Sequence, residues 1–384
     1  MNTSMFAIRG RVVTPDEVLG DAVVTIIGDR IEAVDSFEEW HAANAGATAP
    51  QPVGTLLPGL VDIHCHGGGG HAFTTADVTE MAAAARHHHE FGTTTLLASL
   101  VTARPETLTE QVATLIPLVD DGTLAGIHLE GPFLSDVRCG AQDPAYLLEP
   151  DPALTAVLLE AGNGRVRVMT VAPELDGYAE LAAQLRARGV IVAIGHTDAD
   201  YATTRDALRD DACLVTHLAN GMPPLHHRRS GPVGASLVAA ADGDAVVEVI
   251  GDGIHVDAGF VAMVFAAARG NVALVTDAMA AAGMPDGTYQ LGPQRVAVED
   301  GIARIANGSI AGGTSHLIEV LQRTVRESAI PLVDAVRAAS EIPAAVLGLD
   351  GTCGSIRPGR YADLIVVDDD LELGSVMRRG SWLS

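Results

Sequence analysis

The stretch "GLVDIHCH" (Gly59–His66) is an apolar run that ends in polar residues, and the same arrangement recurs along the chain. Eight runs share it: "GLVDIHCH" (Gly59–His66), "TTTLLASLV" (Thr93–Val101), "LAGIHLEG" (Leu124–Gly131), "RVRVMTVAPE" (Arg165–Glu174), "VIVAIGHT" (Val190–Thr197), "CLVTHLAN" (Cys213–Asn220), "VVEVIGDGIH" (Val246–His255) and "VALVTDAM" (Val272–Met279). Ala- and Leu-rich stretches typical of helices separate them, such as Asp77–Phe91, Tyr178–Arg188, Tyr201–Arg209 and Phe260–Arg269. Eight alternating strand and helix units predict a (β/α)8 TIM-like barrel, in which the active site lies at the carboxyl ends of the strands.

The two ends of the chain lack a helical period. The first 57 residues contain short β-branched stretches such as "DAVVTIIGDRIEAV" (Asp21–Val34), and the tail contains "GRYADLIVVD" (Gly359–Asp368). We therefore expect residues 1–57 and 346–384 to form one small β-sandwich-like domain. Residues 58–345 would then form the (β/α)8 barrel, inserted between its halves.

The composition excludes several classes of function. A formal charge of −25 repels nucleic acids and anionic lipids, and no apolar run approaches the ~20 residues of a membrane span. All 24 basic side chains are arginine, which excludes a P-loop lysine, a Schiff-base lysine and a carbamylated lysine between two metals. The four cysteines form no CxxC pair, which indicates reduced thiols. We expect a cytoplasmic protein that binds neither nucleic acid nor membranes.

The histidines of the first run form a pair. Because side chains alternate along a strand, His64 and His66 point to one face while Cys65 points to the other, toward the helices. Other runs carry a histidine or carboxylate at the equivalent place: Glu130, His196, His217 and Asp277. Imidazole and carboxylate ligands without a thiolate suit Zn²⁺ or Fe²⁺, so the strand ends predict a divalent metal site.

These residue types also indicate a reaction. Without lysine, only a carboxylate can bridge two ions, and Glu130 is the candidate because its strand is central among the ligand-bearing ones. Asp277 is the candidate general base, because a carboxylate beside an activated water can accept its proton and pass it to a leaving nitrogen. The pattern therefore predicts metal-assisted hydrolysis.

The order of motifs along the chain carries a family resemblance. After the HxH pair come "HLEGPF" (His128–Phe133), "GHTDA" (Gly195–Ala199), "THLANGMPP" (Thr216–Pro224), "GDGIHVD" (Gly251–Asp257) and "LVTDAMAAAG" (Leu274–Gly283). Together they resemble the N-acetylglucosamine-6-phosphate deacetylases of the amidohydrolase superfamily, over nearly the whole chain. The resemblance implies hydrolysis of N-acetyl-D-glucosamine 6-phosphate to D-glucosamine 6-phosphate and acetate, in amino-sugar catabolism.

The resemblance also implies roles for the strand-end residues. Glu130, His196 and His217 would hold the principal metal, and His64 and His66 would complete a second site, so that one or two ions bind. Asp277 would activate the water. His255 would orient the acetamide or stabilise the oxyanion that develops on it.

For the sugar phosphate, the same resemblance implies contacts from several loops. Asn220 and the backbone of Gly221 would bind the phosphate, together with Arg228 from the neighbouring subunit of a homodimer. The backbone at Ile310, Ala311 and Gly312 would contact the sugar, as would the loop that contains Ala141 and Gln142. The family usually has a histidine where Gln142 stands and a glutamate where Arg229 stands.

Two other functions are compatible with parts of this pattern. A deaminase or a cyclic-amide hydrolase would use the same metal chemistry but would not need a phosphate site. A non-catalytic barrel that serves as a scaffold would not need the ligands. We further expect the run His87–His89 to lie late in a helix and to be solvated.

Overall fold

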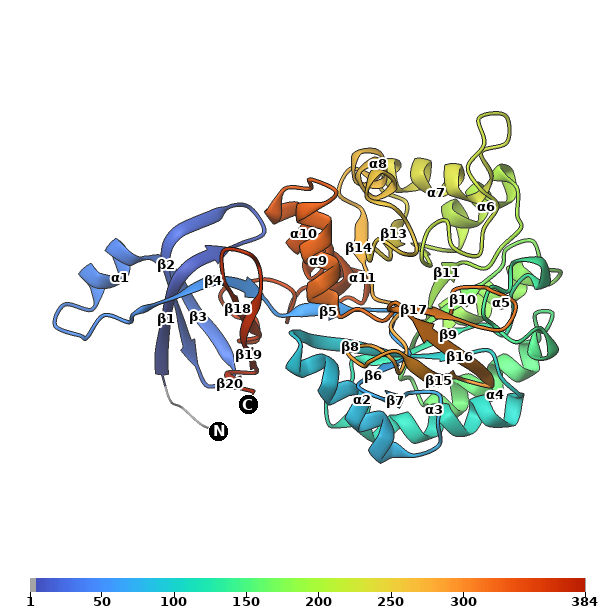
Figure 1. Ribbon diagram of the computed structural model, residues 1–384, viewed down its shortest axis with the longest axis horizontal. Helices are drawn as coiled ribbons and strands as arrows, with labels where there is room; N and C mark the ends of the chain where they lie inside the picture. The colour runs from blue at the N-terminus through green and yellow to red at the C-terminus, as the bar shows by residue number, and fades with distance from the viewer. Residues whose placement is uncertain (1–4, 384) are drawn as a thin grey trace.

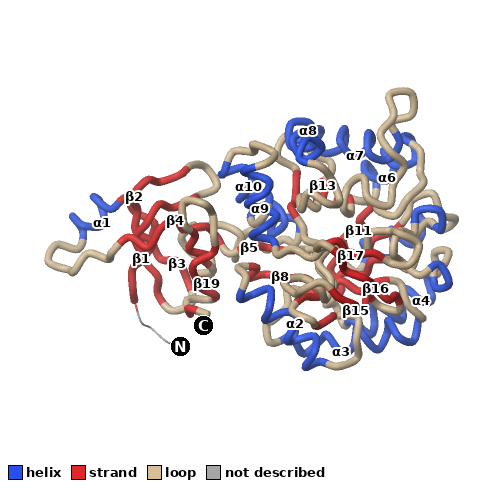
Figure 2. Tube along the Cα trace, viewed as in Figure 1, coloured by secondary structure: helices blue, strands red, loops and turns tan. Residues whose placement is uncertain are grey.

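The computed structural model describes residues 5–383, which form two bodies (Figure 1). A β-sheet built from both ends of the chain lies on one side, and a barrel of strands and helices lies on the other. Figure 2 shows that the helices surround the barrel strands, whereas the terminal body consists of strands, the loops between them and the short helix α1 (Phe37–Ala43). Within these residues no helix is long and apolar enough to cross a membrane.

The barrel strands confirm the predicted (β/α)8 fold. Within residues 5–383 eight parallel strands follow one another in the order β14-β13-β12-β11-β10-β9-β8-β5. Their bounds are β5 (Leu60–Asp62), β8 (Thr93–Val101), β9 (Gly126–Glu130), β10 (Val166–Val171), β11 (Ile191–Ile194), β12 (Leu214–Val215), β13 (Val246–Val249) and β14 (Val272–Leu274). Beyond β5 and β14, the amide of Asp277 donates to the carbonyl of His64 over 2.9 Å, and Cys65 pairs with Ala278. These contacts nearly close the barrel.

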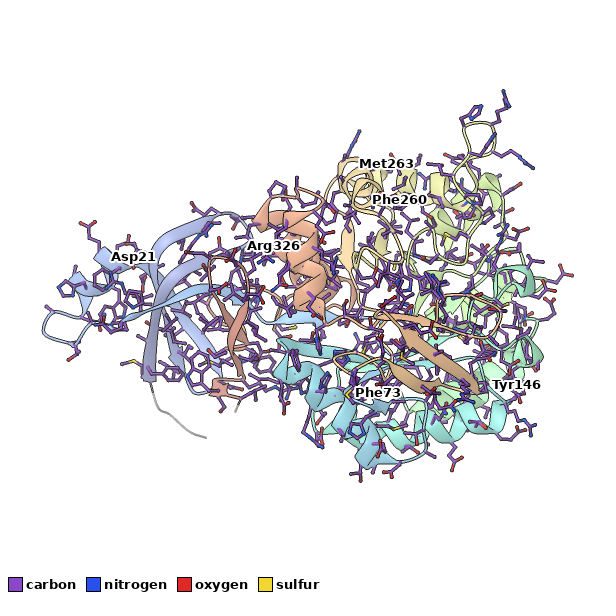
Figure 3. The ribbon with its side chains drawn as sticks, in the orientation of Figure 1. Asp21, Phe73, Tyr146, Phe260, Met263 and Arg326 are labelled. Carbon is purple, nitrogen blue, oxygen red and sulfur yellow. The ribbon has the colours of Figure 1, made fainter. Side chains whose placement is uncertain are left out.

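Helices cover the outside of the barrel and continue after it. They are α2 (Val78–Glu90), α3 (Pro105–Asp120), α4 (Pro152–Gly162), α5 (Tyr178–Ala187), α6 (Tyr201–Asp210), α7 (Gly231–Asp242), α8 (Ala258–Ala268), α9 (Leu317–Arg326), α10 (Leu332–Ala338) and α11 (Glu341–Val346). Aspartate caps begin several of them: Asp77 accepts from the amide of Thr79, and Asp151 accepts from that of Ala153. Side chains fill the space between strands and helices (Figure 3), where Phe73 near α2 is fully buried.

Strands from both termini form one sheet with a core of its own. Within residues 5–383 its order is β20-β19-β18-β4-β1-β2-β3. The bounds are β1 (Met5–Val13), β2 (Val18–Ile27), β3 (Arg30–Ser36), β4 (Pro52–Pro58), β18 (Leu364–Val367), β19 (Leu373–Arg378) and β20 (Ser381–Trp382), and α1 (Phe37–Ala43) follows β3. The join between the two halves of the chain is the antiparallel pair of β4 and β18. This arrangement confirms that both ends build the small β-body, while the domain boundaries stay predictions.

A small antiparallel sheet between β14 and α9 was not predicted. It consists of β15 (Gly287–Leu291), β16 (Gln294–Glu299) and β17 (Ile302–Arg304). Apolar side chains of this sheet, such as Val296, pack against Met279 after β14 and Val101 at the end of β8. The sheet therefore covers part of the carboxyl end of the barrel. Shorter elements complete the chain: the pair β6 (Gly67–Gly68) and β7 (His71–Ala72), and the 3-10 turns Asp136–Arg138 and Pro144–Tyr146.

The expectation that His87–His89 are solvated was wrong. These residues lie at the end of α2 as predicted, but His88 and His89 are buried against the barrel. The Nε2 of His88 donates to the carbonyl of Gly67 over 2.8 Å and lies 3.2 Å from the sulfur of Cys65. Burial lowers the pKa of His88 to about 3, so this ring is neutral. Cys65 thus points to the helices, as the alternation of the strand required.

Candidate active site

Six polar side chains converge at the carboxyl end of the barrel. They are His64, His66, Glu130, His196, His217 and Asp277, and all six are buried. Glu130 is the last residue of β9, and the others follow β5, β11, β12 and β14 within a few residues. Parallel strands present their carboxyl ends at one edge, so residues far apart in the sequence meet there.

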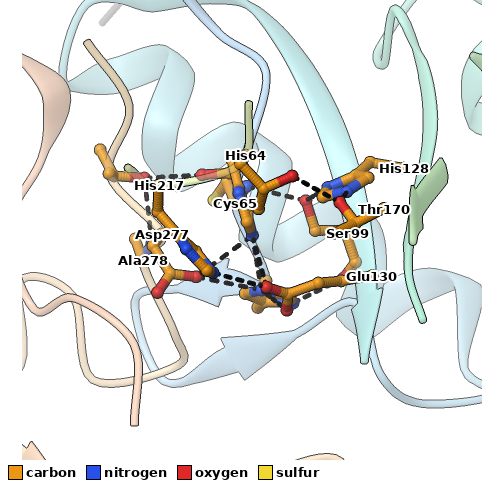
Figure 4. Close-up of polar contacts among 12 residues, drawn as sticks. His64, Cys65, Ser99, His128, Glu130, Thr170, His217, Asp277 and Ala278 are labelled. Atoms are coloured by element: carbon orange, nitrogen blue, oxygen red, sulfur yellow. Dashed lines mark hydrogen bonds and ion pairs between the residues drawn. The ribbon is translucent and has the colours of Figure 1, made fainter. Parts of the chain in front are cut away.

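Glu130 lies at the centre of this cluster (Figure 4). Its Oε1 is 2.9 Å from Nε2 of His217 and 3.0 Å from Nε2 of His196. Its Oε2 is 3.3 Å from Nε2 of His66, whose ring also lies 3.1 Å from Oδ1 of Asp277. The ligand atoms form two groups, each with all its atoms within 4.8 Å of one another: Glu130, His196 and His217, and His64, His66, Glu130 and Asp277. Glu130 belongs to both groups.

The orientation of the histidine rings fits a divalent cation. The Nδ1 of His64 lies 3.0 Å from a carboxylate oxygen of Glu248, that of His66 lies 3.0 Å from the carbonyl of Ser99, and that of His196 lies 2.8 Å from the carbonyl of Arg138. These oxygens only accept, so each Nδ1 carries the proton. The Nε2 atoms are then the ones available as ligands, and an acceptor behind the ring is the usual support of a metal-binding histidine.

The charges within the cluster also fit a site for a divalent cation. Burial lowers the pKa of His66, but hydrogen bonds with Asp277 and Glu130 outweigh it and raise the pKa to about 9. Burial raises the pKa of Asp277, but the charge of His64 and the hydrogen bond with His66 outweigh it and lower the pKa to about 2. The metal-free cluster therefore holds an ionised Asp277 beside a protonated His66. A cation that binds to His66 displaces that proton.

Three of the converging residues have left-handed backbone. The φ angles of His196, His217 and Asp277 are 46°, 25° and 48°. Non-glycine residues rarely adopt positive φ, and such strain concentrates at functional sites, where the surrounding structure holds it. Each strand therefore turns sharply at its end, which directs the side chain across the barrel mouth.

Two buried residues that support the cluster were not predicted. His128 lies two residues before Glu130 in β9, so both side chains are on the same face of the strand. The ring of His128 contacts the hydroxyl of Ser99 at 2.9 Å and that of Thr170 at 2.8 Å. Burial lowers the pKa of His128 well below its ordinary value. Glu248 of β13 contacts both His64 and His217. Polar residues within the apolar runs "GIHLE" and "VVEV" were the signal that could have identified them.

A cavity of about 270 Å³ opens onto the cluster. Its lining includes most of the predicted substrate residues: Ala141, Gln142, Asn220, Gly221, His255, Ile310 and Gly312. Ala311 does not line it, because its methyl group packs into the core under the β15–β17 sheet. A larger hollow of about 430 Å³ between α8 and α10 is lined by residues such as Phe265 and Ile330 and by none of the converging ones.

Arg228 does not line the cavity of its own chain. The loop that leads into α7 projects from the barrel (Figure 1). Arg228 lies in this loop and is exposed. The contribution of Arg228 to a phosphate site from a neighbouring subunit therefore stays a prediction.

Gln142 and His255 are each held by a neighbour. The side-chain amide of Gln142 donates to Oε2 of Glu130 over 2.7 Å, and its oxygen accepts from the amide of Thr102 over 2.8 Å. Gln142 therefore supports Glu130 as well as lining the cavity. The Nδ1 of His255 donates to Asp252 over 2.8 Å, which leaves Nε2 for a ligand.

A close backbone approach beside Asp277 gives a first prediction. Gly313 donates to the carbonyl of Asp277 over 2.7 Å, and a Cβ at Gly313 would collide with the carbonyl oxygen of Thr276. Gly313→Ala is expected to lower the free energy of unfolding by about 1–3 kcal/mol, because the backbone must move apart, and to displace Asp277. Chemical denaturation measures this change. Gly351→Ala, where a Cβ meets no atom within 4 Å, is the matched control; equal stability of the two variants would contradict the prediction.

Comparison with other proteins agrees with this geometry. The sequence profile of the amidohydrolase family matches residues 55–383. The chain belongs to the amidohydrolase family. The matched residues include the whole barrel and the carboxyl-terminal strands of the small sheet.

Several amidohydrolases are similar over nearly the whole chain. The N-acetylglucosamine-6-phosphate deacetylase of Bacillus subtilis (strain 168) is 34% identical, over 96% of this chain and 94% of its own. The N-acetylgalactosamine-6-phosphate deacetylase of Escherichia coli O157:H7 is 32% identical, over 86% and 88%. The structure of a mutant N-acetyl-D-glucosamine-6-phosphate deacetylase from Mycobacterium smegmatis, in complex with N-acetyl-D-glucosamine-6-phosphate, is 41% identical, with 99% of each chain covered and a TM-score of 0.93.

Proposed function

We propose that this amidohydrolase hydrolyses the acetamide of N-acetyl-D-glucosamine 6-phosphate, which yields D-glucosamine 6-phosphate and acetate in amino-sugar catabolism. The observation that carries the proposal is the cluster of imidazoles and carboxylates that opens into the cavity lined by Asn220 and Gly221. The similarity to deacetylases named for this substrate supports it. We also propose a cytoplasmic location, in keeping with the free cysteines.

The two groups of ligand atoms support one arrangement for bound metal. Glu130, His196 and His217 would hold the principal ion, and His64 and His66 would hold a second one with Glu130 and Asp277. The donors suit Zn²⁺ or Fe²⁺. Such an ion supplies Lewis acidity, because it brings the pKa of a coordinated water to about 7 and polarises a carbonyl.

The residues of the chain then handle the proton and the developing charge. Asp277 is ionised and accepts a proton from the water while the oxygen of that water bonds to the acetamide carbon. Asp277 returns that proton to the nitrogen, which leaves as the amine when the C–N bond breaks. Burial lowers the pKa of His255, but the hydrogen bond with Asp252 and the charge of that carboxylate outweigh burial and raise the pKa, which favours the doubly protonated ring. Nε2 of that ring donates to the carbonyl oxygen, where negative charge develops.

Arg228 leads us to propose a homodimer with a shared phosphate site. Asn220 and Gly221 supply neutral contacts in the cavity, and the exposed Arg228 of a second copy would supply the positive charge. Arginine binds phosphate through two parallel hydrogen bonds, and hydrogen bonds to charged groups contribute about 1.5–3 kcal/mol. This contribution would be made only to phosphorylated substrates.

Arg228→Ala is accordingly expected to raise KM for the phosphorylated sugar by about 10- to 100-fold and to leave the slow turnover of N-acetylglucosamine unchanged. Steady-state acetate release measures both. Co-expression of Arg228→Ala with a catalytically dead Asp277→Asn chain tests the sharing. In mixed dimers the dead chain supplies Arg228 to the intact site, so part of the wild-type activity should return. A mixture no more active than Arg228→Ala alone would show that Arg228 acts within its own chain.

Turnover of a panel of substrates tests the function itself, with acetate release measured for the acetylated sugars. The panel contains the 6-phosphates of N-acetylglucosamine, N-acetylgalactosamine and N-acetylmannosamine, a hydantoin and a nucleobase. We expect N-acetylglucosamine 6-phosphate to be the best substrate. Faster release of ammonia from the nucleobase, or opening of the hydantoin ring, would identify a deaminase or a cyclic-amide hydrolase instead.

A further inference from the structure

We propose that Glu248 is a positioning residue that holds the two groups of metal ligands together and makes binding of the second ion possible. The proposal rests on the proposed function only in requiring that the cluster binds metal. It concerns a residue behind the ligands, outside the set that lines the cavity.

The side chain of Glu248 lies inside the barrel. In β13 the neighbouring Val247 and Val249 pack into the core beneath the helices, so alternation directs Glu248 to the interior. Only 1% of its surface is exposed. A carboxylate in such a place is costly unless its oxygens accept hydrogen bonds, and those bonds are therefore integral to the site.

One oxygen of Glu248 serves both groups of ligands. Oε2 is 3.0 Å from Nδ1 of His64, which belongs to the second group, and 3.1 Å from the backbone nitrogen of His217, which belongs to the principal group. The backbone carbonyl of Glu248 also accepts from the amide of Leu218 over 2.8 Å. Glu248 thus holds the strained turn at His217 and the ring of His64 at the same time.

For His64 the carboxylate decides which nitrogen faces the ions. Because Glu248 only accepts, Nδ1 carries the proton and Nε2 is the ligand atom. That Nε2 lies 3.2 Å from Nε2 of His66 and 3.4 Å from Oδ1 of Asp277. Without the acceptor, the ring can rotate or place its proton on Nε2, and the second group loses a ligand.

The principal group depends on Glu248 less directly. His217 is held by its backbone, and its Nε2 is already within 2.9 Å of Glu130. Within residues 5–383 its Nδ1 has no hydrogen-bond partner, so its ring orientation is set without the carboxylate of Glu248. Loss of Glu248 should therefore weaken the second ion more than the first.

Metal uptake by the full chain, measured without substrate, tests the proposal. Metal-free protein is titrated with Zn²⁺ in chelator buffers, and bound metal per chain is counted by mass spectrometry. The wild-type chain should take up two ions in separate steps. In Glu248→Ala the affinity for the second ion should fall at least about tenfold, while the first step moves by less than threefold. Glu248→Gln, which keeps the shape, serves if the alanine variant does not fold and should show a smaller shift in the same direction.

Two further variants give the experiment its specificity. Asp363→Asn removes a buried carboxylate that directly precedes β18 and should leave both metal-binding steps unchanged. The His64→Gln variant should not bind the second ion at all. Adding Glu248→Ala to that variant should therefore have no further effect on metal uptake. Equal weakening of both ions, an unchanged second step, or a single step in the wild-type chain would overturn the proposal. Failure of the proposed function would appear separately, as absence of acetate release from a chain that binds its metal normally.

Discussion

Asp277→Asn is expected to lower kcat by about 10³-fold while the principal ion stays bound. An amide has nearly the shape of the carboxylate, so the packing of the barrel mouth is kept. It cannot accept the proton of the attacking water or return it to the leaving nitrogen. The measurement is acetate release at saturating substrate, together with the metal content of the same sample.

The matched control for this variant is Asp300→Asn. Asp300 is also an aspartate in left-handed conformation, with a φ of 52°, but it is exposed in the turn between β16 and β17. Its substitution should leave kcat unchanged. Undiminished activity of Asp277→Asn would show that another group handles the proton, and the mechanism proposed for this site would be wrong.

Glu130→Gln is expected to abolish both metal binding and turnover. Its two oxygens contact four histidines, and it is the residue that the two groups of ligands share. The amide nitrogen of glutamine cannot bind a cation, and it faces the ring nitrogens whichever way the amide turns. We expect metal affinity to fall by more than about 100-fold, beyond the effect of losing a residue behind a ligand.

The stability of the metal-free chain should change as well. In that state Glu130 lies 3.3 Å from the buried, protonated His66, and removal of one partner of a buried ion pair costs about 3–5 kcal/mol. Chemical denaturation of metal-free protein measures the loss. The control is Glu319→Gln, which breaks a carboxylate–histidine contact of 3.0 Å with His316 outside the cavity. Wild-type metal content in Glu130→Gln would contradict the assignment of Glu130 as the shared ligand.

The barrel and its cluster could be predicted because both follow from local rules. Each strand is an apolar run that ends at a polar residue, and parallel strands bring those ends to one edge. His196 and Asp277 are therefore placed by their position in a run, with no knowledge of loop structure. The prediction that both ends of the chain build one small β-body followed from the absence of helical period there; the pairing of β4 with β18 was not predicted.

The parts that were missed depend on contacts between distant segments. Glu248 and its strand neighbours look like an ordinary strand, and only the packing of β13 beside β12 shows which ligand the carboxylate reaches. The burial of His88 depends on α2 packing against the segment after β5, where its ring meets Cys65 and Gly67, and amphipathic period alone does not say how deep a helix packs. The β15–β17 sheet follows the last barrel strand, where the repeating pattern no longer applies. Gln142 was expected to touch the sugar, and its bond to Glu130 depends on how a loop folds back.

The most direct test of the whole account is acetate release by one preparation in two states. Metal-free protein and the same protein reloaded with Zn²⁺ are each given N-acetylglucosamine 6-phosphate and, side by side, N-acetylglucosamine. The account predicts rapid release from the phosphorylated sugar by the reloaded protein alone, with little from the sugar that lacks phosphate. Equal turnover of the two sugars would contradict the phosphate site, and equal turnover with and without metal would contradict the role of the strand-end cluster.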